Sequence, residues 1–142
     1  MSNETFYQYW GKARQESDGC HLLPYHCMDV AAVSARWWEA GAPLRQRIRH
    51  ATGLDEEAVR AWTLFFVALH DLGKFDIRFQ LKAPAALAAV WPAFTLDQAD
   101  PEPGFSHGPA GLYWFKKELA GSLLSETRMD RWLPWVLSLI HI

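Results

Sequence analysis

Hydrophobic residues recur at helical intervals along most of the chain, and the clearest case is 22–40 (LLPYHCMDVAAVSARWWEA). Four of its residues follow the spacing i, i+4, i+7, i+11 and therefore share one helix face: His26, Val30, Val33 and Trp37. Pro24 suits the first turn of a helix and Gly41 suits its end. We predict a helix over 22–40, with His26 on the same buried face as the apolar residues.

A second helix is predicted over 54–72. The sequence TGLD (52–55) has the form of a capping box, which would begin this helix. The helix has a broad apolar face, made by Val59, Trp62, Phe66 and Leu69. Gly73 is well placed to end it, so His70 and Asp71 would lie in the last turn of a buried helix. The basic stretch that precedes it, PLRQRIRH, fits either a small helix or a loop.

The remaining pattern also favours helices. We predict one over 74–87, a proline-rich loop over 92–105, a helix over 106–121 with Ser106 as N-cap, and a last helix from 130. Pro134 would lie in the first turn of that last helix. No segment shows convincing strand-like alternation, so the predicted fold class is all-α, with residues 1–142 as one domain. Because the last helix stops on apolar residues without a cap, we interpret the chain either as a fragment of a longer protein or as one whose last few residues are not the original ones.

Composition restricts the classes of protein that fit. The chain has 142 residues, of which 50% are hydrophobic, enough for one packed core and unlike a disordered segment. The net charge of −2 means that any contact with nucleic acid would depend on a local basic patch. Two cysteines imply neither a disulfide framework nor a cysteine zinc site. We expect a cytoplasmic protein, since neither a signal peptide nor a membrane-length apolar run is present.

Two ionisable residues, His70 and Asp71, follow the apolar run AWTLFFVAL. Burying either group alone costs several kcal/mol unless something pairs with it. A divalent metal would provide that pairing, because imidazole and carboxylate groups are common ligands of transition metals. The candidate ligands are His26, His70, Asp71 and His107. An aspartate has two oxygens and could therefore bridge two ions.

Each candidate also has a purely structural interpretation. A histidine on an apolar helix face, such as His26, is usually a hydrogen-bonded core residue, and His107 could cap a turn. The pattern HDxGK after a buried helix is more specific than either histidine alone.

A possible DNA path is formed by basic residues at i, i+4 and i+8: Lys74, Arg78 and Lys82. Phe75 and Phe79 lie between them, as in surfaces that stack single-stranded bases. An ordinary solvated helix face is the favoured interpretation of this stripe, and also of the arginines within 45–49.

HDLGK, preceded by a helical histidine, resembles the HD superfamily of metal-dependent phosphohydrolases. More closely, the whole chain resembles the N-terminal nuclease domain of the CRISPR-associated helicase–nuclease of type I systems, in the subtype that works with the Cascade complex. The matching motifs are YWGKA, HLLPYHCMDVAAV, AWTLFFVALHDLGKFDIRFQ, SHGPAGLYWF and WLPWV.

The resemblance implies an all-helical HD fold that holds two divalent ions of iron, manganese, nickel or cobalt, with zinc less favoured. His26 would be the first ligand, His70 and Asp71 the central pair with Asp71 bridging, and His107 a ligand of the second ion. Lys74 would stabilise phosphate charge beside Asp71. The implied substrate is single-stranded DNA, delivered by an attached ATP-driven helicase that works with the crRNA-guided Cascade complex.

The chain departs from the family after WLPWV, where the family continues into a glycine–His–His–glycine motif and a later aspartate. This chain instead ends in SLIHI, and His141 does not reproduce the motif. We therefore expect weak or single-ion occupancy and poor activity from these residues alone. Two alternatives stay open: an HD phosphohydrolase that acts on nucleotides or cyclic nucleotides, and a catalytically incomplete fragment.

Overall fold

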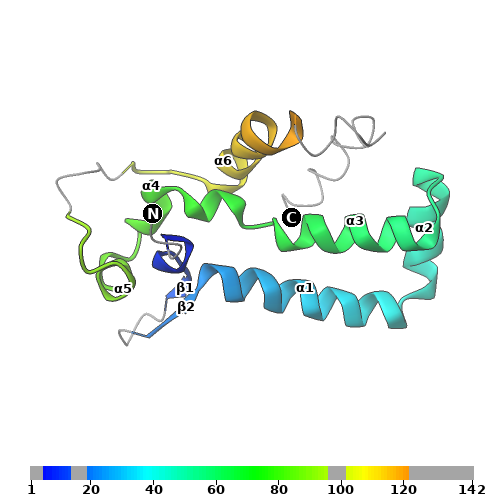
Figure 1. Cartoon of the computed structure of the whole chain (residues 1–142), viewed down its shortest axis with the longest axis horizontal. Helices are drawn as coiled ribbons and strands as arrows, with labels where there is room; N and C mark the ends of the chain where they lie inside the picture. Colours follow the sequence, from blue (N-terminus) through cyan, green and yellow to red (C-terminus); the bar gives the residue numbers. More distant parts are fainter. Residues whose placement is uncertain (1–4, 14–18, 96–101, 122–142) are drawn as a thin grey trace.

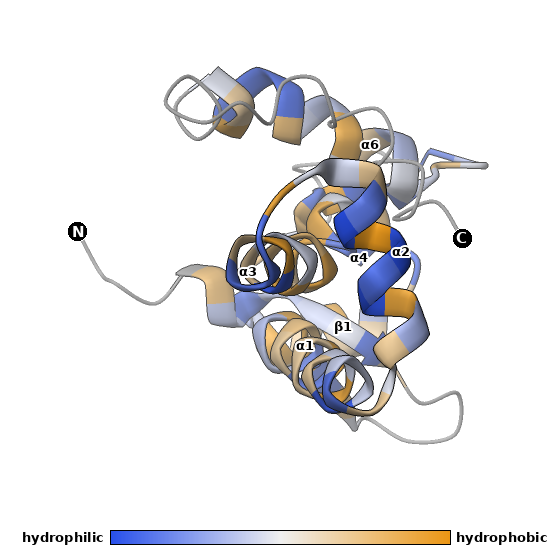
Figure 2. Cartoon of the chain, turned by 90° about the vertical axis from the view of Figure 1, so that its right-hand side faces the viewer, coloured by the Kyte–Doolittle hydropathy of each residue, from blue (hydrophilic) through white to orange (hydrophobic). Residues whose placement is uncertain are grey.

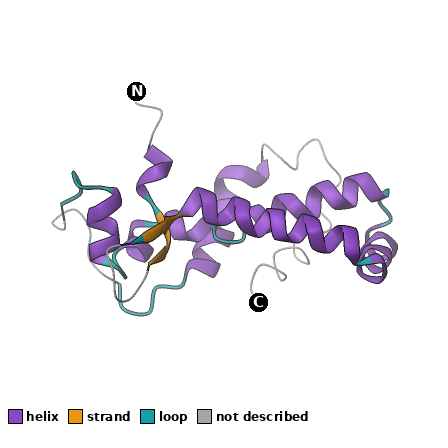
Figure 3. Ribbon diagram, turned by 90° about the horizontal axis from the view of Figure 1, so that it is seen from below, coloured by secondary structure: helices purple, strands orange, loops and turns teal. Residues whose placement is uncertain are grey.

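A computed structural model describes residues 5–13, 19–95 and 102–121. The protein is mainly helical, which confirms the predicted fold class (Figure 3). The helix predicted from residue 130 and part of the predicted loop lie outside the described residues. None of the helices in the described ranges has the length and apolar character needed to cross a bilayer.

Two long antiparallel helices, α1 (Leu23–Ala40) and α3 (Glu56–Ala68), lie side by side (Figure 1). The shorter helix α2 (Ala42–Thr52) joins them, so the basic stretch is a helix (Figure 2). Arg45 and Arg49 of α2 both lie within ion-pair distance of Glu56, the first residue of α3.

The predicted apolar face of α1 is correct at its start and wrong toward its end. His26 is buried, but Val33 is 54% exposed and Trp37 is 72% exposed. Trp38 is buried in place of Trp37. Neighbouring side chains on a helix point about 100° apart, so only one of the two tryptophans could face the interior.

The predicted capping box is also wrong. Thr52 is the last residue of α2, and its hydroxyl donates to the Ile48 carbonyl (2.8 Å). Gly53 then takes the left-handed conformation (φ 67°) that ends α2. The N-cap of α3 is Asp55, whose carboxylate accepts a hydrogen bond from the Ala58 backbone nitrogen (2.8 Å).

We predict that Asp55→Ala lowers the free energy of unfolding by about 1 kcal/mol, because it removes an N-cap acceptor. Urea denaturation followed by circular dichroism measures the change. Asp55→Asn is the matched control, because its amide oxygen can still accept the bond and should retain most of the stability. An equal loss in the two variants would contradict a capping role.

Two predicted helices in the middle of the chain differ from the structure. Helix α3 ends at Ala68, so His70 and Asp71 lie in the turn that follows it and not in its last turn. The predicted helix over 74–87 is divided into a 3-10 turn, η2 (Leu72–Phe75), and helices α4 (Ile77–Gln80) and α5 (Pro84–Val90).

Local capping explains the division. Asp76 is the N-cap of α4, and its carboxylate accepts a hydrogen bond from the Arg78 backbone nitrogen (3.0 Å). Pro84 begins α5, and proline disfavours the helical conformation in the residue before it. Both signals are present in the sequence, and they override the continuous apolar spacing.

A short hairpin, which the sequence analysis missed, precedes α1. Strand β1 (Trp10–Ala13) pairs antiparallel with β2 (Cys20–Leu22). The pairing shifts between Trp10 and Lys12, which places a bulge at Gly11. Strands of four and three residues are too short to show a recognisable alternation.

Helix α6 (His107–Trp114) packs across η2 and continues into a π-helical segment, Phe115–Leu119. Ser106 is its N-cap by position but makes no side-chain capping bond. One buried cluster joins β1 to α4, α5 and Phe105, and a second joins α3 to the π-helical segment through Phe66 and Phe115.

Candidate metal centre

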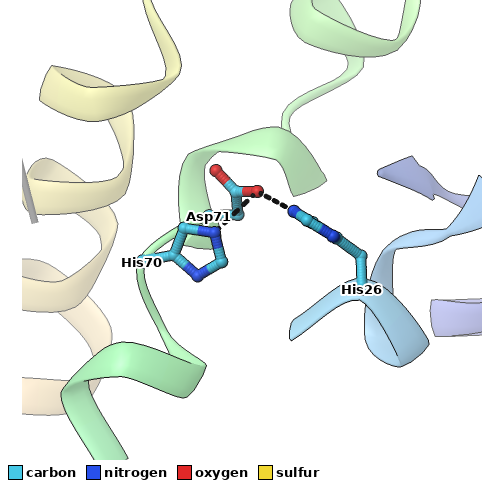
Figure 4. A group of neighbouring side chains, drawn as sticks. All are labelled: His26, His70 and Asp71. Atoms are coloured by element: carbon cyan, nitrogen blue, oxygen red, sulfur yellow. Dashed lines mark ion pairs between the residues drawn. The ribbon is translucent and has the colours of Figure 1, made fainter. Parts of the chain in front are cut away.

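A buried carboxylate is the focus of the candidate site. Asp71 is 4% exposed, and its Oδ2 atom lies 3.1 Å from His26 Nε2 and 3.1 Å from His70 Nε2. His26 comes from the first turns of α1, and His70 and Asp71 come from the turn after α3; both rings point to the carboxylate (Figure 4). One ligand atom from each of the three residues lies within 4.8 Å of the others, so the group could hold a metal ion.

The same oxygen lacks a hydrogen bond. Three nitrogens approach Asp71 Oδ2, yet among the described residues none of them meets it with hydrogen-bond geometry. A buried carboxylate oxygen without a hydrogen bond is costly; the Lys74 ammonium 2.7 Å away offsets its charge but leaves the oxygen available to a metal ion.

His70 presents the correct nitrogen for a metal. Its Nδ1 lies 2.8 Å from the Val67 carbonyl, which can only accept, so Nδ1 carries the proton. In the neutral ring, Nε2 then has a lone pair that faces Asp71 Oδ2. Two acceptors at this distance repel unless a proton or a metal ion lies between them, and a backbone bond of this kind is typical of metal-binding histidines. The residues present therefore fit a bound divalent ion.

The electrostatics of the site keep Asp71 ionised. Burial raises the pKa of the Asp71 carboxyl, but the contacts with His70 and Lys74 outweigh it and hold the pKa well below its usual range. The contact with Asp71 raises the pKa of His70. Burial lowers the pKa of His26, which favours the neutral imidazole that a metal requires. Burial raises the pKa of the neighbouring Cys27 to about 11, so this residue is a thiol near neutral pH and a poor ligand.

His107 lies on the other side of the carboxylate. Its Nε2 atom is 3.4 Å from Asp71 Oδ1, whereas His26 and His70 face Oδ2. The two oxygens of one aspartate thus face different groups of imidazoles, which is the arrangement that a bridging carboxylate needs. Burial lowers the pKa of His107; the Asp71 carboxylate opposes this, and the charges of Lys74 and Lys82 lower the pKa further.

Lys74 belongs to the cluster as well. Its ammonium nitrogen lies 2.7 Å from Asp71 Oδ2 and donates to the Gly11 carbonyl (3.2 Å). It also lies 5.3 Å from the centre of the Phe79 ring, which in turn contacts the His107 ring at 5.2 Å. A positive charge is therefore held at the edge of the candidate metal site.

The basic stripe predicted on one helix does not exist in that form, because η2 and α4 are separate. Arg78 makes ion pairs with Asp76 and Glu102 (2.8 Å each) and stacks on Phe105. Lys82 donates to the Phe105 carbonyl (2.6 Å) and fixes the backbone just before α6. The structure thus assigns Arg78 and Lys82 contacts that hold the loop before His107, and whether they bind DNA stays a prediction.

Close backbone packing brings His107 to Asp71. A Cβ at Gly73 would lie 1.8 Å from the His107 carbonyl oxygen and 2.6 Å from the Gly111 nitrogen. A Cβ at Gly111 would in turn lie 2.8 Å from the Gly73 nitrogen. Gly73 does not simply end a helix, as predicted, but allows η2 and α6 to touch backbone to backbone.

Sequence reasoning missed the residues whose hydrogen bonds hold Lys74 in place: Trp10, Gly11 and Gln80. The motif YWGKA contains two of them, but nothing local indicates that they contact a site more than sixty residues away. Gln80 could have been noticed as a polar residue between two apolar ones, Phe79 and Leu81, which are both buried.

A mainly helical chain in which a helical histidine and an adjacent His–Asp pair meet at one buried carboxylate has the architecture of an HD domain. Comparison with known families extends this assignment: the chain belongs to the family described as "Cas3, HD domain", which it matches over residues 10–141. The resemblance inferred from the motifs is thereby confirmed.

A curated relative from Escherichia coli (strain K12), the CRISPR-associated endonuclease/helicase Cas3, is 39% identical over an alignment 149 positions long. The alignment covers 90% of this chain and 16% of the relative, so the chain spans about a sixth of that protein's length. No solved structure matches this chain significantly.

Proposed function

We propose that this chain is the metal-dependent nuclease part of a CRISPR interference protein, which hydrolyses phosphodiester bonds of single-stranded DNA in the cytoplasm. The observation that carries the proposal is the buried Asp71 oxygen, which has two imidazole nitrogens at 3.1 Å and no hydrogen bond among the described residues. Family membership and the relative, an endonuclease/helicase, support a nuclease activity.

His26 and His70 would hold one divalent ion together with Asp71 Oδ2, and His107 would hold a second beside Oδ1. Manganese, iron, nickel and cobalt suit this set of imidazole and carboxylate ligands. When bound, such ions supply Lewis acidity at the scissile phosphate and make a water molecule more acidic.

Lys74 has a separate role in this proposal. Its ammonium group lies beside the ligand carboxylate and can offset negative charge that develops on the phosphoryl oxygens. Lys82, whose positive charge lowers the pKa of His107, would attract the phosphate backbone toward the His107 side of Asp71. In the complete system, an ATP-driven helicase would deliver the strand after recruitment by the crRNA-guided Cascade complex.

Two measurements test the proposal. The purified protein is stripped with EDTA and reloaded with Mn²⁺ or Ni²⁺, and the bound metal is counted by mass spectrometry. It is then offered a labelled single-stranded oligonucleotide, the matching duplex, and free or cyclic nucleotides. We expect these residues alone to bind metal weakly or as a single ion, and the slow metal-dependent cleavage that results to favour the single strand.

His26→Ala should lose bound metal, whereas His50→Ala, an exposed histidine of α2, should retain it. Hydrolysis of free nucleotides with intact DNA would favour a different HD phosphohydrolase. A wild-type protein that binds no metal would reject the proposal.

A further inference from the structure

Gln80 is a fully buried polar residue, 0% exposed, that joins three separate segments. Its amide oxygen accepts a hydrogen bond from the Trp10 nitrogen (2.9 Å). Its amide nitrogen donates to the Trp10 carbonyl (3.0 Å) and to the Lys74 carbonyl (2.7 Å). The Trp10 indole nitrogen donates to the Gln80 carbonyl (3.0 Å). The side-chain amide takes part in three of these four bonds: it accepts one and donates two. Neither a carboxylate nor a hydroxyl can do this.

Gln80 is hydrogen-bonded to strand β1, and the bulge of β1 lies beside the candidate metal centre. The bulge lies at Gly11, and bulges commonly occur next to active sites, where they redirect a group. The Gly11 carbonyl accepts a hydrogen bond from Lys74 Nζ. A Cβ at Gly11 would lie 3.0 Å from His26 Cβ, so the same bulge packs directly on the first turns of α1.

Gln80 therefore holds Lys74 at both ends: its backbone directly, and its ammonium group through Trp10 and Gly11. We propose that Gln80 is a positioning residue, which anchors the bulged strand β1 so that the Gly11 carbonyl holds the Lys74 ammonium against Asp71. The inference rests on the proposed function in so far as Lys74 acts there on substrate phosphate. The placement of Lys74 itself is independent of that function.

The test measures how accessible the Lys74 amine is to acetylation in the intact chain. Limited reaction with acetic anhydride is followed by mass spectrometry of chymotryptic peptides, and Lys117, which is exposed, serves as the internal reference. Gln80→Met keeps the length of the side chain and removes all of its amide hydrogen bonds. We expect the ratio of Lys74 to Lys117 modification to rise about tenfold through local opening of β1.

Leu87→Ala is the matched control, because Leu87 packs in the same buried cluster as Trp10 but makes none of these polar contacts. It should destabilise the fold while changing the modification ratio by less than about twofold. An unchanged ratio in Gln80→Met, or an equal rise in both variants, would overturn the inference. If Gln80→Met does not fold, Trp10→Phe, which removes the indole hydrogen bond to the Gln80 carbonyl together with part of the buried ring, is judged by the same criterion.

A second readout separates positioning from general support. The losses of stability in Gln80→Met and Lys74→Met should be non-additive in a double-mutant cycle, whereas those of Leu87→Ala and Lys74→Met should add. Mn²⁺ binding by the wild-type chain is measured in parallel. A chain that binds no Mn²⁺ would refute the proposed function, while the labelling ratio would still decide the role of Gln80.

Discussion

Asp71→Asn should abolish metal binding while the helical fold is retained. The substitution keeps the size of the side chain, but it removes the charge that His26, His70 and Lys74 surround at 3.1 Å or less. Loss of a residue that merely supports a metal ligand already costs about 10- to 100-fold in affinity. Loss of the carboxylate shared by all of the imidazoles should therefore cost more than about 100-fold.

Isothermal titration with Mn²⁺ or Ni²⁺ measures this effect, and circular dichroism reports whether the fold persists. Asp29→Asn is the matched control, because Asp29 is an exposed acid on α1 that pairs with His21 at 3.4 Å. Its removal should leave the affinity for metal unchanged. Similar affinities in the wild-type and Asp71→Asn proteins would mean that the imidazoles bind metal without the carboxylate, which would contradict the proposed centre.

The candidate ligands could be predicted from sequence because their signals are local. HDLGK follows an apolar run, and His26 falls at a helical interval from other apolar positions. Each feature constrains only its own segment, yet the structure brings His26 within 3.1 Å of a carboxylate 45 positions later in the chain. Their convergence follows from the antiparallel pairing of α1 and α3, which the predicted helices permit but do not specify.

Boundaries were less predictable, because two physical rules compete over residues 74–87. The apolar spacing favours one continuous helix, whereas Asp76 and Pro84 each favour a new start. The capping bond of Asp76 and the restriction imposed by Pro84 prevail. This division of the helix changes the candidate site, because Lys74 and Arg78 do not share one helix face. Lys74 pairs with Asp71, whereas Arg78 pairs with Asp76.

Long-range packing could not be read from the sequence. Gly73 looks like an ordinary helix stop, and its actual role depends on the backbone of residues 107 and 111. Gln80 looks like a solvent-facing residue, and its burial depends on Trp10, seventy positions earlier. Such roles appear only when the partner segment is known, because neither contact leaves a periodic or local pattern.

Gly73→Ala should be the most destabilising single-methyl change in the described part of the chain. The added Cβ would lie 1.8 Å from the His107 carbonyl oxygen and 2.6 Å from the Gly111 nitrogen. Both of these atoms belong to the backbone, so no flexible side chain can move aside. Helix α6 would have to separate from η2, which should lower the free energy of unfolding by about 3 kcal/mol or more, the upper range for overpacking. The same separation would withdraw His107 from Asp71 Oδ1.

Thermal unfolding and titration with Mn²⁺ measure the two consequences of Gly73→Ala together. Gly121→Ala is the matched control, since a Cβ there would meet nothing within 4 Å. That variant should be as stable as wild type, or slightly more so, because alanine favours helix over glycine by about 1 kcal/mol. Gly111→Ala should give an intermediate loss, as its Cβ would approach the Gly73 nitrogen at 2.8 Å. If Gly73→Ala matched Gly121→Ala in both measurements, η2 and α6 could not be in the backbone contact that brings His107 to Asp71.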